Sequence, residues 1–480
     1  MKTKLFLATL ALAGCISSVQ AIKDIRWGSS GNPLTGLTVT WNNTGTADSI
    51  SWGYSSSFEQ GKSLAVKRAG NASGQNFFKY VFATVTPNAT INYKLYDSNT
   101  HTWGTAMTYQ TAPPVNTNSF CFLGIGDSRD NMTVWGQIAT QALAKNADFA
   151  IFNGDIVASG GTTSLWDSWF TSGKQFLQNT LVYHSMGNHD ATSVPFYKNT
   201  FDLPQVSGSN LYYSFTYGNA LFICLNSESA SDAAQYNWLK STLQTYQNDT
   251  SITWRIVFNH RPFYTIGNHA GEMNAYYTTW WKAFDDYGVD IVCNGHDHMY
   301  ERTKPINRNV STTAAVTTYG SGTGQGRCEI VCGGAGAPLY TGTTSWFIQK
   351  YSSSYNFINF CVNGKSLHGT AYSNTNAVID TFTINKVTVG IETMNQRFNQ
   401  IEVYPNPTQN VFTLKCVSPQ TGEGVVRILD LNGKELRKEK VTKSQELFEN
   451  KYDLGGYAPG AYFVELTVAG QTDHVMLMVN

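Results

Sequence analysis

The chain has 480 residues, enough for two to four domains, and its apolar fraction of 41% suffices for large hydrophobic cores. Charged residues make up only 14%, and 33 basic side chains balance 33 acidic ones to a formal net charge of zero. A neutral chain offers no basic field to attract nucleic acid or an anionic membrane surface, so neither is an expected partner. An aromatic fraction of 13% with abundant glycine is typical of β-rich extracellular proteins.

The first 21 residues have the pattern of an export signal. Two lysines precede an apolar run from Leu5 to Gly14, and Val19-Gln-Ala21 fits a small-residue cleavage site. The run is too short to span a bilayer. We therefore expect a signal peptide at residues 1–21 and a secreted or cell-surface protein. Leu12-Ala-Gly-Cys15 also resembles a lipobox, so a lipid on Cys15 is the alternative.

Three regions of different character follow. Residues 22–113 contain short strand-like runs separated by turn residues, which predicts a β-sandwich. Residues 114–390 alternate apolar runs with helical periodicity, at 134–145 and 235–244, which predicts an α/β layer fold. Residues 399–480 return to β patterns and contain no cluster of catalytic residue types.

Eight cysteines are present, and seven remain if Cys15 leaves with the signal peptide. An odd number cannot pair completely within the chain. Cys121, Cys224 and Cys293 each lie in an apolar run and are expected to be buried thiols. Cys328 and Cys332 are about 13 Å apart in an extended strand, too far for a local disulfide.

Five apolar runs of the central region end in residues that can bind a metal. The donors that follow these runs are Asp127, Asp155, Asn188, His260 and the pair His296 and His298. Ligands collect at the carboxyl ends of strands in α/β sheets, so one sheet could bring all six donors together. Four of them follow a glycine, which permits a tight turn out of a strand.

This mixed set of oxygen and nitrogen donors favours Zn, Mn or Fe over Ca or Mg. A carboxylate shared between two cations would hold them about 3.5–4 Å apart. Such a pair can clamp the attacking and leaving oxygens of an in-line displacement at phosphorus. Turn residues and core polar groups are the alternative explanation, but independent strands would not all end in this way.

The motifs at these positions resemble those of the calcineurin-like metallophosphoesterases, in order and over about 170 residues. The matching segments are Gly126-Asp-Ser-Arg129, Gly154-Asp155, Gly187-Asn-His-Asp190, Asn259-His260 and Gly295-His-Asp-His298. His260-Arg-Pro-Phe-Tyr264 and the extension to Tyr300-Glu-Arg302 point to the purple acid phosphatase-like branch. The resemblance implies an α/β (α+β) four-layer fold, two β-sheets flanked by helices, between an N-terminal fibronectin type III-like sandwich and a C-terminal all-β sandwich.

The same resemblance assigns roles to individual residues. It implies two metal ions, Fe, Mn or Zn, the first held by Asp127 and His298 and the second by Asn188, His260 and His296, with Asp155 bridging them. His189 would face the phosphate and either protonate the leaving oxygen or stabilise the transition state, and Asp190 would orient His189 by a hydrogen bond. His269 resembles a second histidine that faces the phosphate, although an ordinary loop histidine is the alternative.

Two departures from the branch stand out. A tyrosine expected three residues after the bridging aspartate is Ala158 here, so no iron–tyrosinate bond is expected. A ligating histidine of other members, two residues after the first aspartate, is Arg129 here, and arginine cannot bind a cation. The first metal would keep three protein ligands. Arg129 either contacts a phosphate oxygen with its fork of donors or forms a structural salt bridge.

The C-terminal region resembles a different family, the type IX secretion sorting domain. Val403-Tyr-Pro-Asn-Pro-Thr408, Asp430-Leu-Asn-Gly-Lys434 and the segment from Leu454 to Phe463 carry this resemblance over about eighty residues. It implies the type IX secretion machinery as a partner. Such tails are usually removed or exchanged for a surface anchor during export.

Several polar and aromatic residues have simpler explanations. Glu272 is expected to be a solvated loop charge, and His184, within a strand, a core histidine. Trp280 and Trp281 are expected to pack in the core. Asp130 and Asn131 are expected to cap the helix that follows them.

The sequence therefore predicts a secreted phosphatase in which metal-activated hydroxide attacks a small phosphomonoester. A phosphodiesterase of the same fold is one alternative, because the sequence does not define the loops around the centre. A surface binding protein that retains the fold without turnover is another, because the expected tyrosine and histidine ligands are missing.

Overall fold

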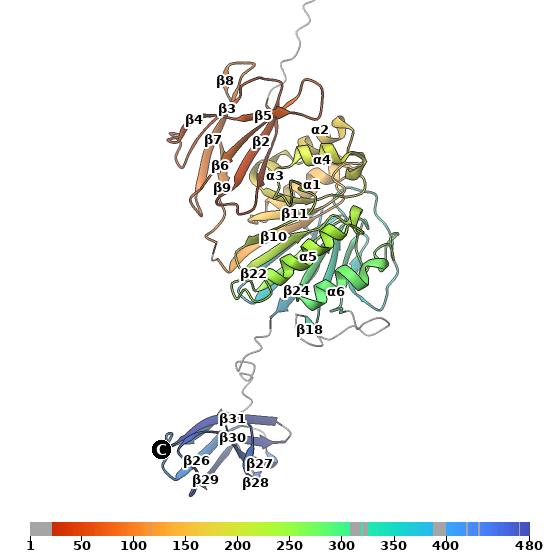
Figure 1. Cartoon of the computed structure of the whole chain (residues 1–480). Helices are drawn as coiled ribbons and strands as arrows, with labels where there is room; N and C mark the ends of the chain where they lie inside the picture. Colours follow the sequence, from red (N-terminus) through yellow and green to blue (C-terminus); the bar gives the residue numbers. More distant parts are fainter. Residues whose placement is uncertain are drawn as a thin grey trace, which may run out of the picture. The chain divides into compact units, whose positions relative to one another are not determined.

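The computed structural model of the chain describes residues 22–115, 117–307, 318–319, 325–386, 400–418, 421–430, 433–469 and 471–480. The chain divides into two compact units, Met1–Lys386 and Val387–Asn480 (Figure 1). The predicted signal peptide, with Cys15, lies outside the described residues. Among the described residues, no helix is both long and apolar enough to cross a membrane.

Two large β-sheets form the first unit. The strand order of the ten-stranded sheet is β24 (Val378–Asn385), β23 (Ser366–Ser373), β22 (Asn356–Asn363), β10 (Ser119–Ile125), β11 (Phe149–Asn153), β12 (Leu181–Ser185), β1 (Lys23–Ser29), β2 (Leu37–Asn43), β6 (Asn76–Phe82) and β5 (Val66–Ala69). The order of the seven-stranded sheet is β13 (Tyr213–Tyr217), β14 (Ala220–Cys224), β15 (Trp254–Phe258), β16 (Ile291–Asn294), β20 (Cys328–Cys332), β17 (Tyr300–Thr303) and β21 (Ile348–Ser352). A two-stranded pair, β18 (Thr318–Tyr319) and β19 (Gln325–Gly326), completes this region.

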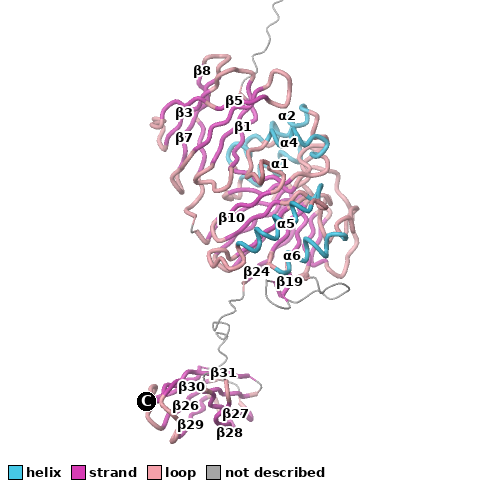
Figure 2. The backbone as a smooth tube through the Cα atoms, in the orientation of Figure 1, coloured by secondary structure: helices cyan, strands magenta, loops and turns pink. Residues whose placement is uncertain are grey.

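Helices cover the outer faces of both sheets (Figures 1 and 2). The helices α1 (Met132–Leu143), α2 (Thr163–Ser172), α3 (Lys174–Asn179) and α4 (Val194–Thr200) lie on the side of the larger sheet, and α5 (Ala233–Thr245) and α6 (Lys282–Asp286) on the side of the smaller one. Shorter turns are η1 (Asp190–Ser193), η2 (Ser227–Ser229), η3 (Asn274–Tyr276) and the π-helical η4 (Tyr277–Trp281). The helices predicted at 134–145 and 235–244 are observed as α1 and α5.

The alternation of side chains along β14 shows how the layers are formed. Ala220, Phe222 and Cys224 pack into the core between the two sheets. Leu221 and Ile223 face the opposite way, in the core beneath α5 and η4. Period-two alternation with apolar residues on both faces is what a strand buried on both sides requires. The predicted four-layer fold with β-rich ends is confirmed.

The N-terminal strands form a β-sandwich that shares a sheet with the layers described above. Its second sheet contains β4 (Gly61–Leu64), β3 (Ser49–Gly53), β7 (Thr90–Asp97), β8 (Thr102–Trp103) and β9 (Met107–Gln110). The first sheet is continuous, because β1 pairs in parallel with β12 at Trp27 and Leu181. The Trp27 ring also stacks on Tyr109, with ring centroids 3.7 Å apart. Sandwich and layers thus share one hydrophobic core.

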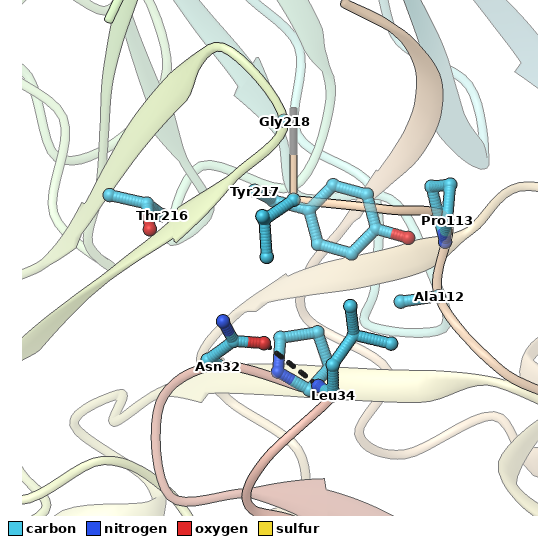
Figure 3. A pocket seen from close by; sticks show the side chains of 9 residues that line it. Asn32, Leu34, Ala112, Pro113, Thr216, Tyr217 and Gly218 are labelled. Carbon is cyan, nitrogen blue, oxygen red and sulfur yellow. Dashed lines mark hydrogen bonds between the residues drawn. The ribbon is translucent and has the colours of Figure 1, made fainter. Parts of the chain in front are cut away.

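A small hollow lies beside residues 112–115, the segment that connects the sandwich to the layers (Figure 3). Its accessible volume is about 20 Å³, room for one water molecule. Leu34, Pro113 and Tyr217 are among its walls, and Asn32 Oδ1 accepts a hydrogen bond from the Leu34 amide at 2.8 Å. The small volume indicates close packing around this connecting segment.

The second unit is a separate β-sandwich with its own core. One sheet contains β25 (Gln400–Tyr404), β26 (Val411–Val417) and β29 (Leu447–Asp453), and the other β28 (Glu435–Lys443), β27 (Gly422–Leu429), β30 (Gly460–Val468) and β31 (Gln471–Val479). Phe412, Leu414, Ile428, Val464 and Leu477 are fully buried between them. The second unit therefore has a hydrophobic core made of its own residues.

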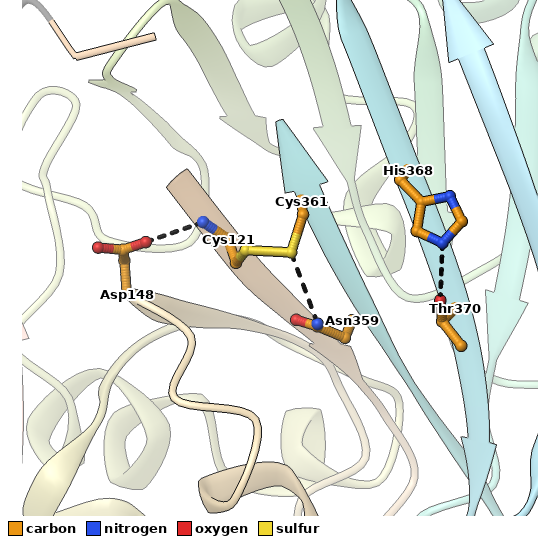
Figure 4. The surroundings of a disulfide bond; sticks show 6 residues. All are labelled: Cys121, Asp148, Asn359, Cys361, His368 and Thr370. Atoms are coloured by element: carbon orange, nitrogen blue, oxygen red, sulfur yellow. Dashed lines mark hydrogen bonds between the residues drawn. A yellow bond between two sulfur atoms is a disulfide. The ribbon is translucent and has the colours of Figure 1, made fainter. Parts of the chain in front are cut away.

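A disulfide joins Cys121 to Cys361 within the larger sheet (Figure 4). The prediction that Cys121 is a buried thiol is therefore wrong. The two cysteines are 240 residues apart but directly opposite each other on the antiparallel strands β10 and β22. Sequence spacing does not show which strands are neighbours, so this pairing was not predictable. Cys224 and Cys293 are buried thiols outside any disulfide, as expected, and Cys328 and Cys332 are not joined to each other, as their spacing predicts.

Replacing both Cys121 and Cys361 by alanine should lower the free energy of unfolding by about 2–5 kcal/mol, because the crosslink closes a long loop in the unfolded chain. Urea denaturation under oxidising conditions measures the change. Cys224→Ala, which removes a buried thiol outside any disulfide, is the control for lost packing. Equal losses from the double and the control variants would show that the crosslink contributes nothing.

Candidate metal centre

The predicted donors lie together, but they come from two sheets. Asp127, Asp155 and Asn188 follow the adjacent strands β10, β11 and β12 of the larger sheet. His260 and His296 follow the adjacent strands β15 and β16 of the smaller sheet, and His298 precedes β17. The expectation that one sheet carries all six donors is therefore wrong. The carboxyl ends of parallel strands in two packed sheets converge on one place.

Four donors surround a first point, which we call the histidine-rich position and which consists of Asp155, Asn188, His260 and His296. His260 Nε2 lies 3.0 Å from Asn188 Oδ1, 3.1 Å from His296 Nδ1 and 3.3 Å from Asp155 Oδ1. All four atoms are hydrogen-bond acceptors when the histidines are neutral, so they repel one another. A cation or proton shared between them removes this repulsion. Asp155, His260 and His296 are all buried and could together hold a metal ion.

A second point, the aspartate-rich position, consists of Asp127, Asp155 and His298, whose ligand atoms lie within 4.8 Å of one another. Asp127 Oδ2 accepts a hydrogen bond from the His296 amide, but the buried Oδ1 has no hydrogen-bond partner among the described residues. His298 Nε2 lies 3.6 Å from that Oδ1. Asp155 contributes to both positions, with Oδ1 toward one and Oδ2 toward the other.

Backbone carbonyls fix which nitrogen of each histidine faces the centre. His260 Nδ1 donates to Asn153 O at 2.8 Å, and His298 Nδ1 donates to Pro338 O at 2.7 Å. A carbonyl can only accept, so Nδ1 carries a proton, and Nε2 is the nitrogen that faces the centre and would bind a metal in the neutral form of each ring. His296 has the opposite arrangement, because its Nε2 lies 3.0 Å from Glu272 Oε2 and its Nδ1 faces His260.

Left-handed backbone conformations occur at three of the donors. The φ angles are +58° at Asp127, +53° at Asp155 and +68° at His296. Such conformations in residues other than glycine store strain and are concentrated at functional sites. Glycines next to the donors leave the necessary space, because a Cβ on Gly187 would collide with Asp155 and one on Gly295 with Asp127.

The pKa values of these groups depend on burial and on one another. Burial raises the pKa of Asp127 well above its ordinary value, and the neighbouring Asp155 adds to the effect. Burial also acts to raise the pKa of Asp155, but the positive charges of His260 and His189 hold it below its ordinary value. Burial alone would lower the pKa of His260, whereas Asp155 and Asp127 raise it to about 10. The centre therefore contains buried carboxylates, and their charged forms are stabilised by nearby positive charge.

His189 lies beside the donors with its ring accessible. Its Nδ1 donates to Ala158 O at 2.8 Å, and its Nε2 lies 3.9 Å from Asp155 Oδ2. The predicted hydrogen bond from Asp190 to this ring is therefore wrong. Asp190 instead accepts from the amides of Ile156, Val157 and Gly187, so it joins the two loops that carry Asp155 and Asn188.

Glu272, expected to be a solvated loop charge, is part of the centre. It contacts His296 Nε2, lies 2.9 Å from His269 Nδ1 and forms an ion pair with Arg261. The His269 ring stacks on His296, with centroids 3.8 Å apart. A carboxylate on the outer nitrogen of a metal-binding histidine fixes its tautomer. The spacing of His269 and Glu272, three residues apart, was the only indication of this in the sequence.

Two further residues of the centre were not predicted from the sequence. Arg261 Nη1 lies 3.1 Å from His296 Nε2, and its guanidinium also forms an ion pair with Glu228, which follows β14. Tyr340 stacks on His298, with centroids 4.1 Å apart. The residues around the donors thus extend beyond those to which the motifs assign a role. Arg261 lies inside the segment His260–Tyr264, but that motif gives it no role, and Tyr340 lies outside every motif.

The remaining predictions for this region are mixed. Asn131 caps α1 as expected, because its side chain accepts from the Val134 amide, whereas Asp130 forms an ion pair with Arg129 instead. His184 is buried and stacks on Phe201, and Trp280 and Trp281 are buried in the core, as expected.

Comparison with known proteins agrees with this arrangement. Residues 100–300 match the family model of the calcineurin-like phosphoesterases, and residues 402–480 match that of the secretion system C-terminal sorting domain. Purple acid phosphatase 18 of Arabidopsis thaliana is 35% identical over 140 residues, covering 26% of this chain and 32% of the relative. Probable inactive purple acid phosphatase 27 of the same plant is 28% identical over 270 residues, covering 50% and 44%. The chain thus spans less than half the length of these relatives.

Solved structures show the same fold. A purple acid phosphatase from yellow lupin seeds superimposes with a TM-score of 0.63 at 18% identity, covering 77% of this chain and 75% of its own. The structure of PhoD superimposes with a TM-score of 0.55 at 11% identity, covering 76% and 93%. The chain therefore carries a calcineurin-like phosphoesterase domain related to the purple acid phosphatases, followed by a C-terminal type IX sorting domain.

Proposed function

We propose that this chain is a secreted, metal-dependent phosphoesterase that hydrolyses phosphomonoesters. The observation that carries the proposal is the histidine-rich position, where four strand ends bring donors together. Asn188 Oδ1, His296 Nδ1 and Asp155 Oδ1 lie 3.0–3.3 Å from His260 Nε2. Two oxygen and two nitrogen donors suit Zn, Mn or Fe. The predicted first metal would be held by Asp127, Asp155 and His298 at the aspartate-rich position.

A metal held at this centre supplies Lewis acidity and lowers the pKa of bound water. The chain's own residues then orient the ester and move its protons. His189, whose side chain is 32% exposed, can in its protonated form donate from Nε2 to the leaving oxygen, because its Nδ1 is held by Ala158. His269, 29% exposed on the other side of His296, can donate to a second phosphate oxygen.

The names of relatives support the metal chemistry and the export route. One matching plant relative is called Fe(3+)-Zn(2+) purple acid phosphatase 12, 32% identical over 164 residues. The C-terminal match to a sorting domain supports a secreted or cell-surface location, with the type IX secretion machinery as a partner. We propose both for this chain.

A second candidate is a binding protein that retains the fold without turnover. The observation in its favour is that two plant relatives matched over about 270 residues are named probable inactive purple acid phosphatases. This candidate predicts a folded protein that binds phosphate esters and leaves them intact, so hydrolysis assays separate the two.

Asp155→Ala should abolish hydrolysis, reducing the rate by about 1,000-fold or more, because Asp155 contributes an oxygen to both positions. Rates on p-nitrophenyl phosphate and bis-p-nitrophenyl phosphate, measured side by side, test this and show whether monoesters or diesters are preferred. Asp249→Asn, in an exposed turn, is the matched control and should leave both rates unchanged. Normal hydrolysis by the Asp155 variant would remove the proposed role of this residue, and faster turnover of the diester would contradict the monoester assignment.

Glu272→Gln should weaken metal binding by about 10–100-fold, because the outer carboxylate that fixes the His296 tautomer is lost. Competition with a chromophoric chelator measures the affinity for Zn²⁺ or Mn²⁺. Glu423→Gln, on β27 of the second unit, is the control. Unchanged affinity in the Glu272 variant would show that this contact does not support the metal.

A further inference from the structure

The two candidate metal positions differ in what lies between their donors. At the histidine-rich position, Arg261 contacts His296 only at its outer nitrogen, and Arg129 approaches Asp155 only at Oδ2. Neither guanidinium therefore lies among the facing atoms, which are Asp155 Oδ1, Asn188 Oδ1, His260 Nε2 and His296 Nδ1. Three of these residues, Asp155, His260 and His296, could together hold a metal.

At the aspartate-rich position a guanidinium group lies among the donors. Arg129 Nη2 is 3.3 Å from His298 Nε2, and Arg129 Nε is 3.4 Å from Asp155 Oδ2. His298 Nδ1 donates to Pro338 O, so His298 Nε2 is the acceptor of the arginine N–H. The arginine therefore interacts with two of the three groups that a metal would need there.

The charge of Arg129 is permanent, because guanidinium does not lose its proton in proteins. A divalent ion at the same donors would lie within a few ångströms of it, in surroundings where Asp127 and Asp155 are no more than 1% exposed. Low dielectric strengthens the repulsion between two such cations. The guanidinium and a metal therefore compete for this position.

We propose that Arg129 takes the place of the first metal, so that the chain binds one metal per centre and the guanidinium provides the second positive charge. This inference rests on the proposed function, and it replaces the pair of metals with one metal and one arginine. When a phosphate ester is bound, the fork of Arg129 donors can contact a phosphate oxygen from the side where a dinuclear centre would have its first ion. Asp155 then connects the metal and the guanidinium through its two oxygens.

Metal content of the full chain tests this inference. After incubation with excess Zn²⁺ or Mn²⁺ and removal of free metal, elemental analysis should find one ion per chain. Arg129→His should bind two, because a neutral imidazole removes the repelling charge and adds a fourth donor to Asp127 Oδ1, Asp155 Oδ2 and His298 Nε2. Thr133→His, which adds a histidine on the exposed side of the first turn of α1, is the matched control and should still bind one.

Arg129→Ala provides a second readout that does not depend on the new histidine. It should lower kcat for p-nitrophenyl phosphate by about 100–1,000-fold while at least one metal stays bound, because the charge facing the phosphate is lost. Two ions in the wild-type chain, one ion in the Arg129→His variant when folded, or an unchanged kcat in the alanine variant would each overturn the inference. If the wild-type chain binds two ions and hydrolyses the ester, only this inference fails and the proposed function stands. A folded wild-type chain without metal or hydrolysis would overturn both.

Discussion

The structure around the candidate metal centre is organised by two carboxylates buried side by side. Asp127 and Asp155 are 0% and 1% exposed, and their oxygens lie within 4.8 Å of each other. Two like charges about 4 Å apart repel by roughly 4 kcal/mol at an effective dielectric constant of about 20, in addition to the desolvation of each. Such a pair is stable only with positive charge beside it. His260, with its pKa raised to about 10, and Arg129 are the groups of the chain that supply that charge.

The fold holds these groups where the backbone alone would not place them. Left-handed conformations at Asp127, Asp155 and His296 cost of order 1–3 kcal/mol each, so they persist only if the surrounding structure determines them. The strands that end just before each donor fix these backbone conformations. Those strands are central, paired on both sides and buried on both faces. The Cys121–Cys361 disulfide adds a covalent link between β10 and its neighbour β22.

The donors were predictable from the sequence because each follows a short apolar run. A run that is buried on both faces needs no polar residue until it leaves the sheet, so a polar residue at its end is conspicuous. The chain order of these runs does not show where one sheet ends and the other begins, or which strands far apart in the sequence are adjacent. For that reason the division of the donors between two sheets and the pairing of Cys121 with Cys361 were not predicted.

Contacts between side chains of different loops were the other part that the sequence did not show. Arg261 directly follows a predicted ligand, yet its role depends on Glu228 and Glu272, which are distant in sequence and near only in the fold. Asp190 lies next to the loops that carry the donors, but its partners are backbone amides rather than the His189 ring. A motif gives the residue and its neighbourhood. The atom that it contacts depends on rotamers and on the path of neighbouring loops.

The loop that carries His269 has little regular structure, yet buried acids hold its backbone. Glu329 accepts from the amides of Phe263 and Tyr264, Glu301 accepts from the Ile266 amide, and Asp297 accepts from the His269 amide. Burial raises the pKa of Glu301 and of Glu329 to about 8, so these acids are protonated or weakly ionised near neutral pH.

The same three acids lie on or next to strands of the smaller sheet, as do His260, His296 and His298. The loop and the metal donors are therefore fixed to one frame, and Glu272 links them by contacting both His269 and His296. A displacement of this loop would move His269, the proposed phosphate-facing group, and would disturb His296, a proposed metal ligand, through the same carboxylate. On this side of the centre, the proposed substrate contact and the proposed metal position are therefore mechanically coupled. On the other side, His189 is coupled to Asp155 through its own backbone amide.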